Sequence, residues 1–299
     1  MKILGKILAG LVLFIVLLVA VGYVASASAV GKRFTVTELA PPIPTDAASI
    51  ARGKHFARAI TKCVACHGDD LGGEVMIDNV LLGRVASVNL TRGDGGRGNS
   101  LTDAQIVTAI RHGVGGDGRS LFIMPSAAMY QHLSDDDVAA IVAYVRSVPP
   151  VDRTQPVSRL GPLGRVLVAA GKLNGMYEAS EINHTAKRRV APTIGPTAEY
   201  GAYLVTVGGC KSCHGPTLSG GEIQNGPDSP VPAANITPDG LKAYDEASFF
   251  RALREGKRPG GTTINPVMPW KLTREMNDVE IRAVWNYLQT VPPKPFGNH

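Results

Sequence analysis

The sequence predicts an all-α fold in which one N-terminal transmembrane helix precedes two tandem domains of the same kind. Three observations predict it. An uncharged apolar run opens the chain, a block of roughly 145 residues occurs twice with its motifs in the same order, and helix-capping signals recur within each copy. The 299 residues divide into a membrane anchor or signal segment at 1–31, a first domain at 46–150, a linker at 151–195 and a second domain at 196–294.

The N-terminal segment is apolar and follows two lysines. Lys2 and Lys6 precede an uncharged run over residues 7–31, whose first eighteen residues are almost wholly apolar. A helix over those eighteen would be about 27 Å long, and the small residues after it would complete a bilayer core of about 30 Å. The lysines predict a cytoplasmic N-terminus. A cleaved signal peptide is the alternative, because residues 25–29 hold two Ala-Ser-Ala triplets, but the long run favours an uncleaved anchor.

Each domain is expected to contain three main helices joined by glycine-rich loops. In the first domain Asp46 is the N-cap candidate of the first helix, and Thr102 or Asp103 is that of a middle helix ending at Gly113. Ser134 begins the last helix, which ends at a proline pair. The loops have almost no period-2 alternation, so no strand is expected. A domain of about 100 residues has a marginal apolar core by itself, which a covalent cofactor would complete.

Two five-residue motifs carry the chemistry. CVACH at 63–67 and CKSCH at 210–214 stand at corresponding places of the repeat. Two cysteines three apart on a helical turn point the same way, so both can bond to the vinyl groups of one haem while the next histidine binds its iron. The residues predicted to bind haem are Cys63, Cys66, His67, Cys210, Cys213 and His214.

A zinc site and a redox disulfide are both less consistent with these motifs. All four cysteines of the chain lie in the two motifs, so no further thiolate is available to close a zinc site within either half. The two pairs are also much farther apart than the roughly 15 to 20 residues of a zinc ribbon. A thioredoxin-like site would need a βαβ context, which neither half offers.

The chain resembles the class I c-type cytochromes, in the two-haem form found as subunits or partners of periplasmic dehydrogenases that act on alcohols, aldehydes and sugars. The resemblance rests on the doubled Cys-x-x-Cys-His motif and covers about residues 46–150 and 196–294. It implies two covalently attached haem c groups and the class I cytochrome c fold. It also implies that a glycine of the first helix, Gly53 or Gly201, crosses the last helix near Tyr144 or Tyr287.

In that family the distal iron ligand is a methionine late in the domain, often followed by proline. The resemblance therefore implies Met124 and Met268, which stand before Pro125 and Pro269, as iron ligands beside His67 and His214. A thioether is a soft donor that raises the reduction potential and fills the coordination sphere. The remaining methionines near these sites, Met76, Met129 and Met276, are expected only to fill core space.

Two further residue pairs occupy equivalent positions in the repeat. By the resemblance, Asn89 and Asn235 of the two Asn-x-Thr triplets would shape the loop beside the haem edge. Arg111 and Arg254 would either pair with haem propionates or cap their own helices, and the sequence leaves both open.

The function implied is electron transfer, with no catalytic residues. The expected donor is a periplasmic dehydrogenase and the acceptor a terminal oxidase or soluble cytochrome, at the periplasmic face of a bacterial inner membrane, or free in the periplasm if the segment is cleaved. No motif supports nucleic-acid binding. The formal charge of +6 would fall to about +2 with four haem propionates. The linker carries seven basic against three acidic residues and would be either a solvated connection or a surface for an acidic partner or anionic lipid.

An enzyme of the dihaem peroxidase class, or another haem-based oxidoreductase, is the alternative function. It would require one iron with an open or displaceable distal position. A thiosulfate-oxidising cytochrome would use a cysteine as a haem ligand, and no cysteine outside the two motifs is left for that role.

Overall fold

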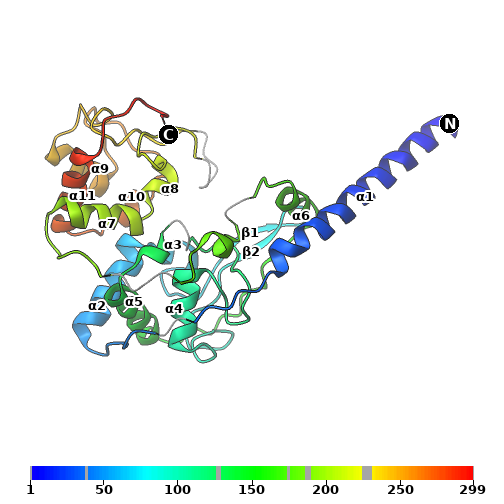
Figure 1. Cartoon of the computed structure of the whole chain (residues 1–299), viewed down its shortest axis with the longest axis horizontal. Helices are drawn as coiled ribbons and strands as arrows, with labels where there is room; N and C mark the ends of the chain where they lie inside the picture. Colours follow the sequence, from blue (N-terminus) through cyan, green and yellow to red (C-terminus); the bar gives the residue numbers. More distant parts are fainter. Residues whose placement is uncertain are drawn as a thin grey trace.

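The structure is a computed structural model that describes residues 2–37, 40–125, 129–173, 176–185, 190–223 and 231–298. A long N-terminal helix, α1 (Lys2–Gly31), projects away from two mostly helical domains that lie side by side (Figure 1). By length and composition α1 is able to cross a membrane, in agreement with the predicted anchor or signal segment. The C-terminal end of the chain lies in the second domain, far from the N-terminus of α1.

The first domain contains the helices that the capping pattern predicts. Its helical elements are α2 (Ala47–His55), a π-helical turn η1 (Phe56–Ile60), α3 (Val64–His67), α4 (Asp103–His112), a 3-10 turn η2 (Tyr130–His132) and α5 (Asp135–Ser147). Asp46 and Ser134 cap α2 and α5 as predicted, and Thr102 rather than Asp103 caps α4, in a capping box with Gln105. Gly113 ends α4 in the left-handed conformation.

The second domain repeats this order. Its elements are α7 (Ala198–Val207), α8 (Cys210–His214), α9 (Glu246–Glu255), α10 (Trp270–Thr273) and α11 (Asp278–Thr290). The first and last helices cross tightly in both domains. A Cβ on Gly53 would lie 1.8 Å from the carbonyl oxygen of Ala140, and one on Gly201 would lie 1.9 Å from that of Ala283. The helix crossing that the resemblance implies at these glycines is confirmed, and both crossings need a residue without a side chain.

The expectation of an all-α chain is too narrow, because the structure contains one small sheet. β1 (Val75–Asn79), β2 (Gly83–Ala86) and β3 (Arg159–Leu160) form it in the order β1-β2-β3, with both pairs antiparallel. β1 and β2 are a hairpin inserted after the first motif, and β3 comes from the predicted linker. The short helix expected in that linker is present as α6 (Pro162–Ala169), and a 3-10 turn η3 (Glu178–Glu181) follows it.

The π-helical turn has a cause in the sequence. Ten positions separate Gly53 from Cys63, whereas nine separate Gly201 from Cys210. A single extra residue in an α-helix is commonly accommodated as one π-helical turn. Here that turn is η1, which follows α2 directly, while α7 of the second domain is α-helical throughout. Both domains thereby keep the helix crossing and the motif in the same relation despite the insertion.

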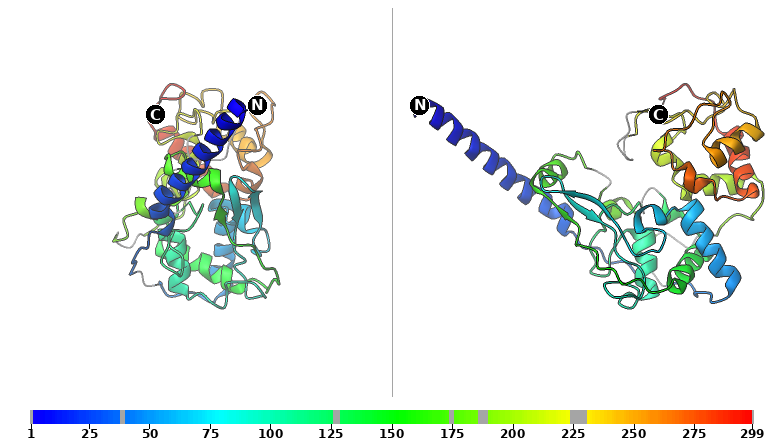
Figure 2. Two further views of the ribbon diagram at one scale, coloured as in Figure 1. Left: turned by 90° about the vertical axis from the view of Figure 1, so that its right-hand side faces the viewer. Right: turned by 180° about the vertical axis from the view of Figure 1, so that it is seen from behind.

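The linker helix α6 packs against the C-terminal part of α1. A Cβ on Gly22 would lie 2.7 Å from Cγ2 of Val166. The guanidinium of Arg165 lies over the ring of Tyr23, 5.1 Å from its centroid, and donates to Oγ of Ser26 at 3.3 Å. The views from the front and from behind both place α6 and the β1-β2 hairpin beside this part of α1 (Figures 1 and 2).

Candidate functional site

The two motifs adopt the same local structure. In each, a residue in the left-handed conformation precedes the first cysteine, Lys62 with φ 56° and Gly209 with φ 72°. A single helical turn, α3 or α8, then carries the second cysteine and the histidine, and a glycine at φ 78° ends it. The cysteines of each motif therefore stand one turn apart, as the spacing predicts. The same backbone appears twice although the two residues between the cysteines differ.

Each motif histidine is held by its Nδ1 atom. Nδ1 of His67 lies 3.0 Å from the carbonyl oxygen of Val88, and Nδ1 of His214 lies 2.7 Å from that of Ala234. A proton held on Nδ1 by a backbone carbonyl leaves Nε2 with the lone pair that binds a metal. Burial lowers the pKa of both imidazoles, so the neutral form required of a ligand is the stable one. Both histidines thus have the tautomer and the neutral form that a metal ligand requires.

The loops that supply these carbonyl groups are tied down by the Asn-x-Thr triplets. Oδ1 of Asn89 accepts from the amide of Thr91 at 2.9 Å, and its Nδ2 donates to the carbonyl of Val151 at 2.7 Å. Asn235 repeats both bonds, with Thr237 at 2.9 Å and Lys294 at 2.7 Å. The loop-shaping role expected for these asparagines is confirmed. Each one connects the loop that orients the histidine to the segment after the last helix.

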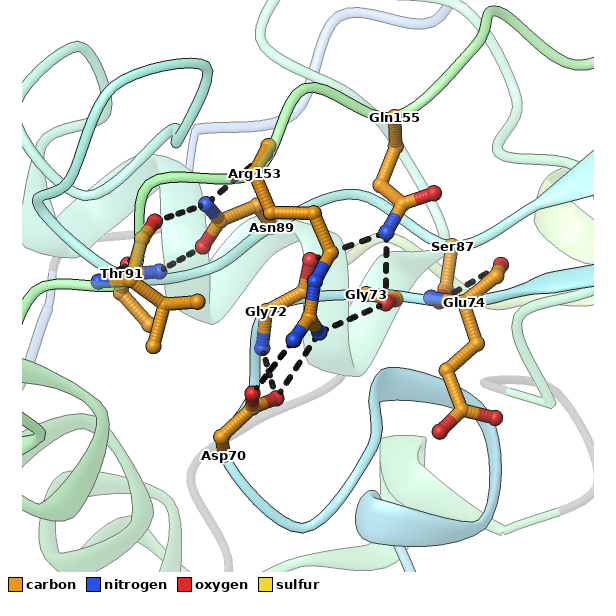
Figure 3. A network of polar contacts seen from close by, with 10 residues as sticks. Asp70, Gly72, Gly73, Glu74, Ser87, Asn89, Thr91, Arg153 and Gln155 are labelled. Atoms are coloured by element: carbon orange, nitrogen blue, oxygen red, sulfur yellow. Dashed lines mark hydrogen bonds and ion pairs between the residues drawn. The ribbon is translucent and has the colours of Figure 1, made fainter.

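A polar network fixes the segment after the first motif to the start of the linker (Figure 3). The carboxylate of Asp70 accepts from Arg153 at 2.9 Å and from the amide of Gly72 at 2.8 Å. Nε2 of Gln155 donates to the carbonyls of Gly72 and Gly73. The linker therefore braces the chain immediately after His67.

The four thiols are not arranged for redox or zinc chemistry. All four cysteines are free, and burial raises the pKa of each thiol, although Thr61 contacts Cys63 at 3.3 Å. A catalytic or disulfide-exchanging thiol needs a lowered pKa. Among the described residues no group of three or more His, Cys, Asp or Glu side chains is arranged to hold a metal ion. The donor set fits thioether attachment of a porphyrin.

The two candidate distal methionines follow equivalent loops. Gly113 and Gly256 end the middle helices in the left-handed conformation, and single antiparallel bridges, Val114 with Ser120 and Lys257 with Thr263, close the turns that follow. Met124 and Met268 come a few residues later and are both half-buried. Their bonds to iron remain a prediction. The other methionines behave as expected where they are buried: Met129 and Met276 are core residues, whereas Met76 lies on the exposed strand β1.

One buried donor near Met268 lacks a partner. Nε1 of Trp270 is buried and has no hydrogen-bond partner among the described residues. Its ring lies against Gly256, where a Cβ would be 2.5 Å from it. A buried N–H without an acceptor is costly, so an acceptor group of a bound cofactor fits this position. The free thiols, the oriented histidines and this donor together fit haem in the second domain, and the first domain offers the same thiols and histidine.

The repeated arginines have a structural role that the sequence left open. Arg111 donates to Oδ1 of Asp135 at 2.7 Å, and Arg254 donates to Oδ1 of Asp278 at 2.5 Å. Each aspartate is the first residue of the last helix. The arginines therefore clamp the middle helix onto the first turn of the last helix. These bonds differ from both roles expected of them, capping of their own helix or pairing with propionates.

The sequence did not reveal the interface that joins the two domains. Asp137 and Glu280, at equivalent places in the first turns of α5 and α11, are both buried. His55 of the first domain reaches Glu280 at 2.8 Å, and Tyr203 of the second domain donates to Asp137. His55 and Tyr203 each stand two residues after the crossing glycine of their domain. The contacts are reciprocal, which is the pattern of a two-fold interface.

The interface also brings the two motifs together. The ammonium group of Lys62, the residue before Cys63, donates to the carbonyls of Ile60 and Gly208, both at 2.9 Å. Gly208 is two residues before Cys210. Met129 lies against Gly209, where a Cβ would be 2.6 Å from its sulfur. The cysteine ends of both motifs thus face the same interface. Two differences between the copies mark this region in the sequence. The first copy has one more residue between the crossing glycine and the first cysteine, and it has Lys62 where the second copy has Gly209.

The comparisons with known proteins agree with this geometry. Relatives include the cytochrome c subunit of a quinone alcohol dehydrogenase from Gluconacetobacter polyoxogenes, 28% identical over 87% of this chain and 59% of that protein. The fructose dehydrogenase cytochrome subunit of Gluconobacter japonicus is 26% identical over 85% of this chain and 56% of its own length. A diheme cytochrome c-type of Cereibacter sphaeroides is 28% identical over 64% of this chain and 66% of its own.

This chain spans about three-fifths of the length of the two dehydrogenase subunits. The cytochrome c family model matches twice, at residues 50–149 and 198–292. These matches contain the two motifs and both pairs of crossing helices, so the chain belongs to the cytochrome c family.

Proposed function

We propose that this protein is a membrane-anchored dihaem c-type cytochrome that carries electrons from a periplasmic dehydrogenase to a terminal oxidase or a soluble cytochrome. The observation that carries the proposal is the doubled motif, in which both histidines are oriented through Nδ1 by equivalent carbonyl groups. Haem c, when attached, supplies a one-electron couple at its iron. The protein supplies the ligands, the burial and the docking surfaces.

The residues divide into the same roles in each domain. Cys63 and Cys66 would form the thioethers of the first haem, and His67 and Met124 would be the ligands of its iron. The second haem would be held by Cys210, Cys213, His214 and Met268. With a methionine sulfur as its second protein ligand, each iron would have no open position, which would suit electron transfer and exclude peroxide or oxygen binding.

The contact between the domains supports transfer within the protein. Lys62 joins the two cysteine ends of the motifs, and Tyr203 of the second domain donates to Asp137, which also pairs with Arg52 of its own domain. Asp137 is fully buried and accepts from Arg52, Ser134 and Tyr203, so its charge is compensated. A docked pair of domains with few moving parts keeps the distance between two redox groups constant.

The dehydrogenase as donor rests on the relatives. Several of them are named as cytochrome subunits of alcohol, fructose and gluconate dehydrogenases. The basic linker residues Lys187, Arg188 and Arg189, which would contribute to an acidic partner's docking surface, lie outside the described residues.

The N-terminal helix supports anchoring. α1 contains 30 residues, and at 1.5 Å per residue it is about 45 Å long, enough for a bilayer core of about 30 Å. Cleavage after residue 27 or 29 would remove Gly22 and Ser26, on which α6 packs. The uncleaved anchor therefore accounts for a packed surface of α6 that a signal peptide would leave exposed.

The test is purification of the full chain from membranes of its own host, with any bound partner. Two haems per chain should remain attached after denaturation and acid-acetone extraction, and a Cys63→Ala, Cys66→Ala variant should retain one. Reduction by a co-purified dehydrogenase, with no peroxide consumption, would support the carrier. Loss of colour on extraction, or one high-spin haem with peroxidase turnover, would contradict it in favour of another haem chemistry.

A further inference from the structure

The β1-β2 hairpin and α6 form an exposed apolar surface that the electron-transfer function does not use. Val80 is 90% exposed and Leu81 59%, and Leu82 and Leu163 are also exposed. We call these four residues the hairpin patch. Large apolar side chains scattered singly on a surface are ordinary, but a contiguous group of them indicates an interaction site.

The four side chains belong to one built unit. The amide of Leu163 donates to the carbonyl of Leu81 at 3.0 Å, and that of Gly161 donates to Leu82 at 2.9 Å. The backbones meet so closely that a Cβ on Gly164 would lie 2.3 Å from the carbonyl oxygen of Leu82. The start of α6 is therefore fastened to the hairpin turn, and the patch keeps its shape without a partner.

The height of this unit along α1 is fixed by the contacts at Gly22, Tyr23 and Ser26. A bilayer core needs about 20 helical residues, so a span that begins at Ile7, just after Lys6, ends near Ser26. Tyr23 then lies at the outer interface, where aromatic side chains are enriched. α6 touches α1 at this level (Figures 1 and 2), so the patch lies at the outer surface of the bilayer.

We propose that the hairpin patch is inserted in the outer leaflet of the membrane that α1 spans, so that hairpin, α6 and α1 form one membrane-bound unit. This inference rests on the proposed anchoring of α1. The occupant is lipid, because the patch continues the apolar surface of α1 directly and because the cation of Arg165, which lies over the ring of Tyr23, is at headgroup level.

The insertion would fix the orientation of the haem domains. A single spanning helix leaves a protein free to rotate and tilt above the membrane, whereas a second point of insertion removes that freedom. The first domain would then stand with its sheet toward the lipid and the domain interface away from it.

The experiment measures depth in the full chain reconstituted in single-copy nanodiscs of phosphatidylethanolamine and phosphatidylglycerol. Nitroxide labels are attached after haem insertion at Val80→Cys, at Leu13→Cys in α1, and at Val190→Cys, which replaces a valine that is also 90% exposed but lies in the linker. With the haems reduced, collisions of each label with oxygen, which partitions into lipid, are compared with those of a polar nickel chelate.

The label at position 80 should favour oxygen over the nickel chelate, like that at position 13, and the label at 190 should show the reverse. If 80 behaves like 190 while 13 stays in lipid, the inference is wrong and the anchor stands. Shielding at 80 that appears only after a dehydrogenase is added overturns it in favour of a protein partner. If the segment with position 13 has been cleaved off, or if its label is fully accessible to the nickel chelate, both the anchor and the inference are wrong.

Discussion

At the residue scale, the prediction that is tested most directly is that Met124 and Met268 bind iron. If both bind iron, Met124→Ala or Met268→Ala should open one distal face, lower that haem's potential and allow one equivalent of carbon monoxide to bind per chain. The near-infrared sulfur-to-iron band should fall to about half. Met276→Leu, a substitution at a buried packing position, is the control and should leave the potential, carbon monoxide binding and the near-infrared band unchanged. An intact band in Met124→Ala would move the ligand elsewhere in the first domain.

The crossing glycines give a second prediction at this scale. Replacing a helical glycine by alanine normally stabilises a helix by about 0.5–1 kcal/mol. At Gly53 and Gly201 the added Cβ would overlap a carbonyl oxygen of the opposite helix, so Gly53→Ala and Gly201→Ala should instead lower the free energy of unfolding by about 1–3 kcal/mol. Gly260→Ala, in a turn with no atom within 4 Å of the added Cβ, is the control without steric overlap. Denaturant unfolding followed by circular dichroism measures all three, and equal stabilities would refute the close crossing.

At the residue scale, the sequence predicts those features that depend on the spacing of residues close together in the chain. Two cysteines one turn apart and the histidine after them form the same turn in both domains, and the spacing alone sufficed to predict it. Lys62 could not be assigned a role in this way. Its acceptor, Gly208, is 146 residues away, and no periodicity or motif relates the two.

At the scale of elements, the helices were predictable and the sheet was not. Helix caps are chemical signals in single residues, and Asp46, Thr102 and Ser134 all act as predicted. A strand is recognised by alternation only when one of its faces is buried. All five residues of β1 are exposed, so its sequence carries no alternation to read.

The π-helical turn is indicated in the sequence by a difference in spacing between the two copies. Aligning the two copies on the crossing glycine and on the first cysteine gives offsets that differ by one. Such a difference inside a helix predicts a π-helical turn rather than a loop, because the flanking helix and motif must both keep their places. The extra residue lies just ahead of Lys62, so it belongs to the segment that joins the domains.

At the scale of the whole molecule, the two domains are joined by buried polar contacts as well as by apolar packing. His55, Asp137, Tyr203 and Glu280 are related by the repeat, yet two of the four differ in type from their counterpart. When equivalent positions of two copies hold different residue types, their relation is hard to see in the sequence, although the reciprocal contacts are still made. These polar pairs could therefore be identified only once the two domains were seen side by side.

A pair at the rim of this interface gives a pH-dependent prediction. Arg58 of the first domain donates to both carboxylate oxygens of Glu275 of the second, at 2.9 and 3.0 Å. The hydrogen bond from Arg58 lowers the pKa of Glu275 below its ordinary value of 4.5. A carboxyl group whose folded pKa is lowered contributes stability above its unfolded pKa and loses it as the pH falls through the folded pKa.

A double-mutant cycle with Arg58→Met and Glu275→Gln isolates this pair from the second partner of Arg58, Asp69. Both side chains are partly exposed, so the coupling at pH 7 should be only about 0.5 kcal/mol. It should vanish at an acidic pH below the folded pKa of Glu275, where the carboxyl group is protonated, and it should weaken in high salt. Urea unfolding of the four holoproteins at both pH values measures it. A coupling of the same size at both would mean that the contact acts through packing, and that the charge of Glu275 contributes nothing to holding the two domains together.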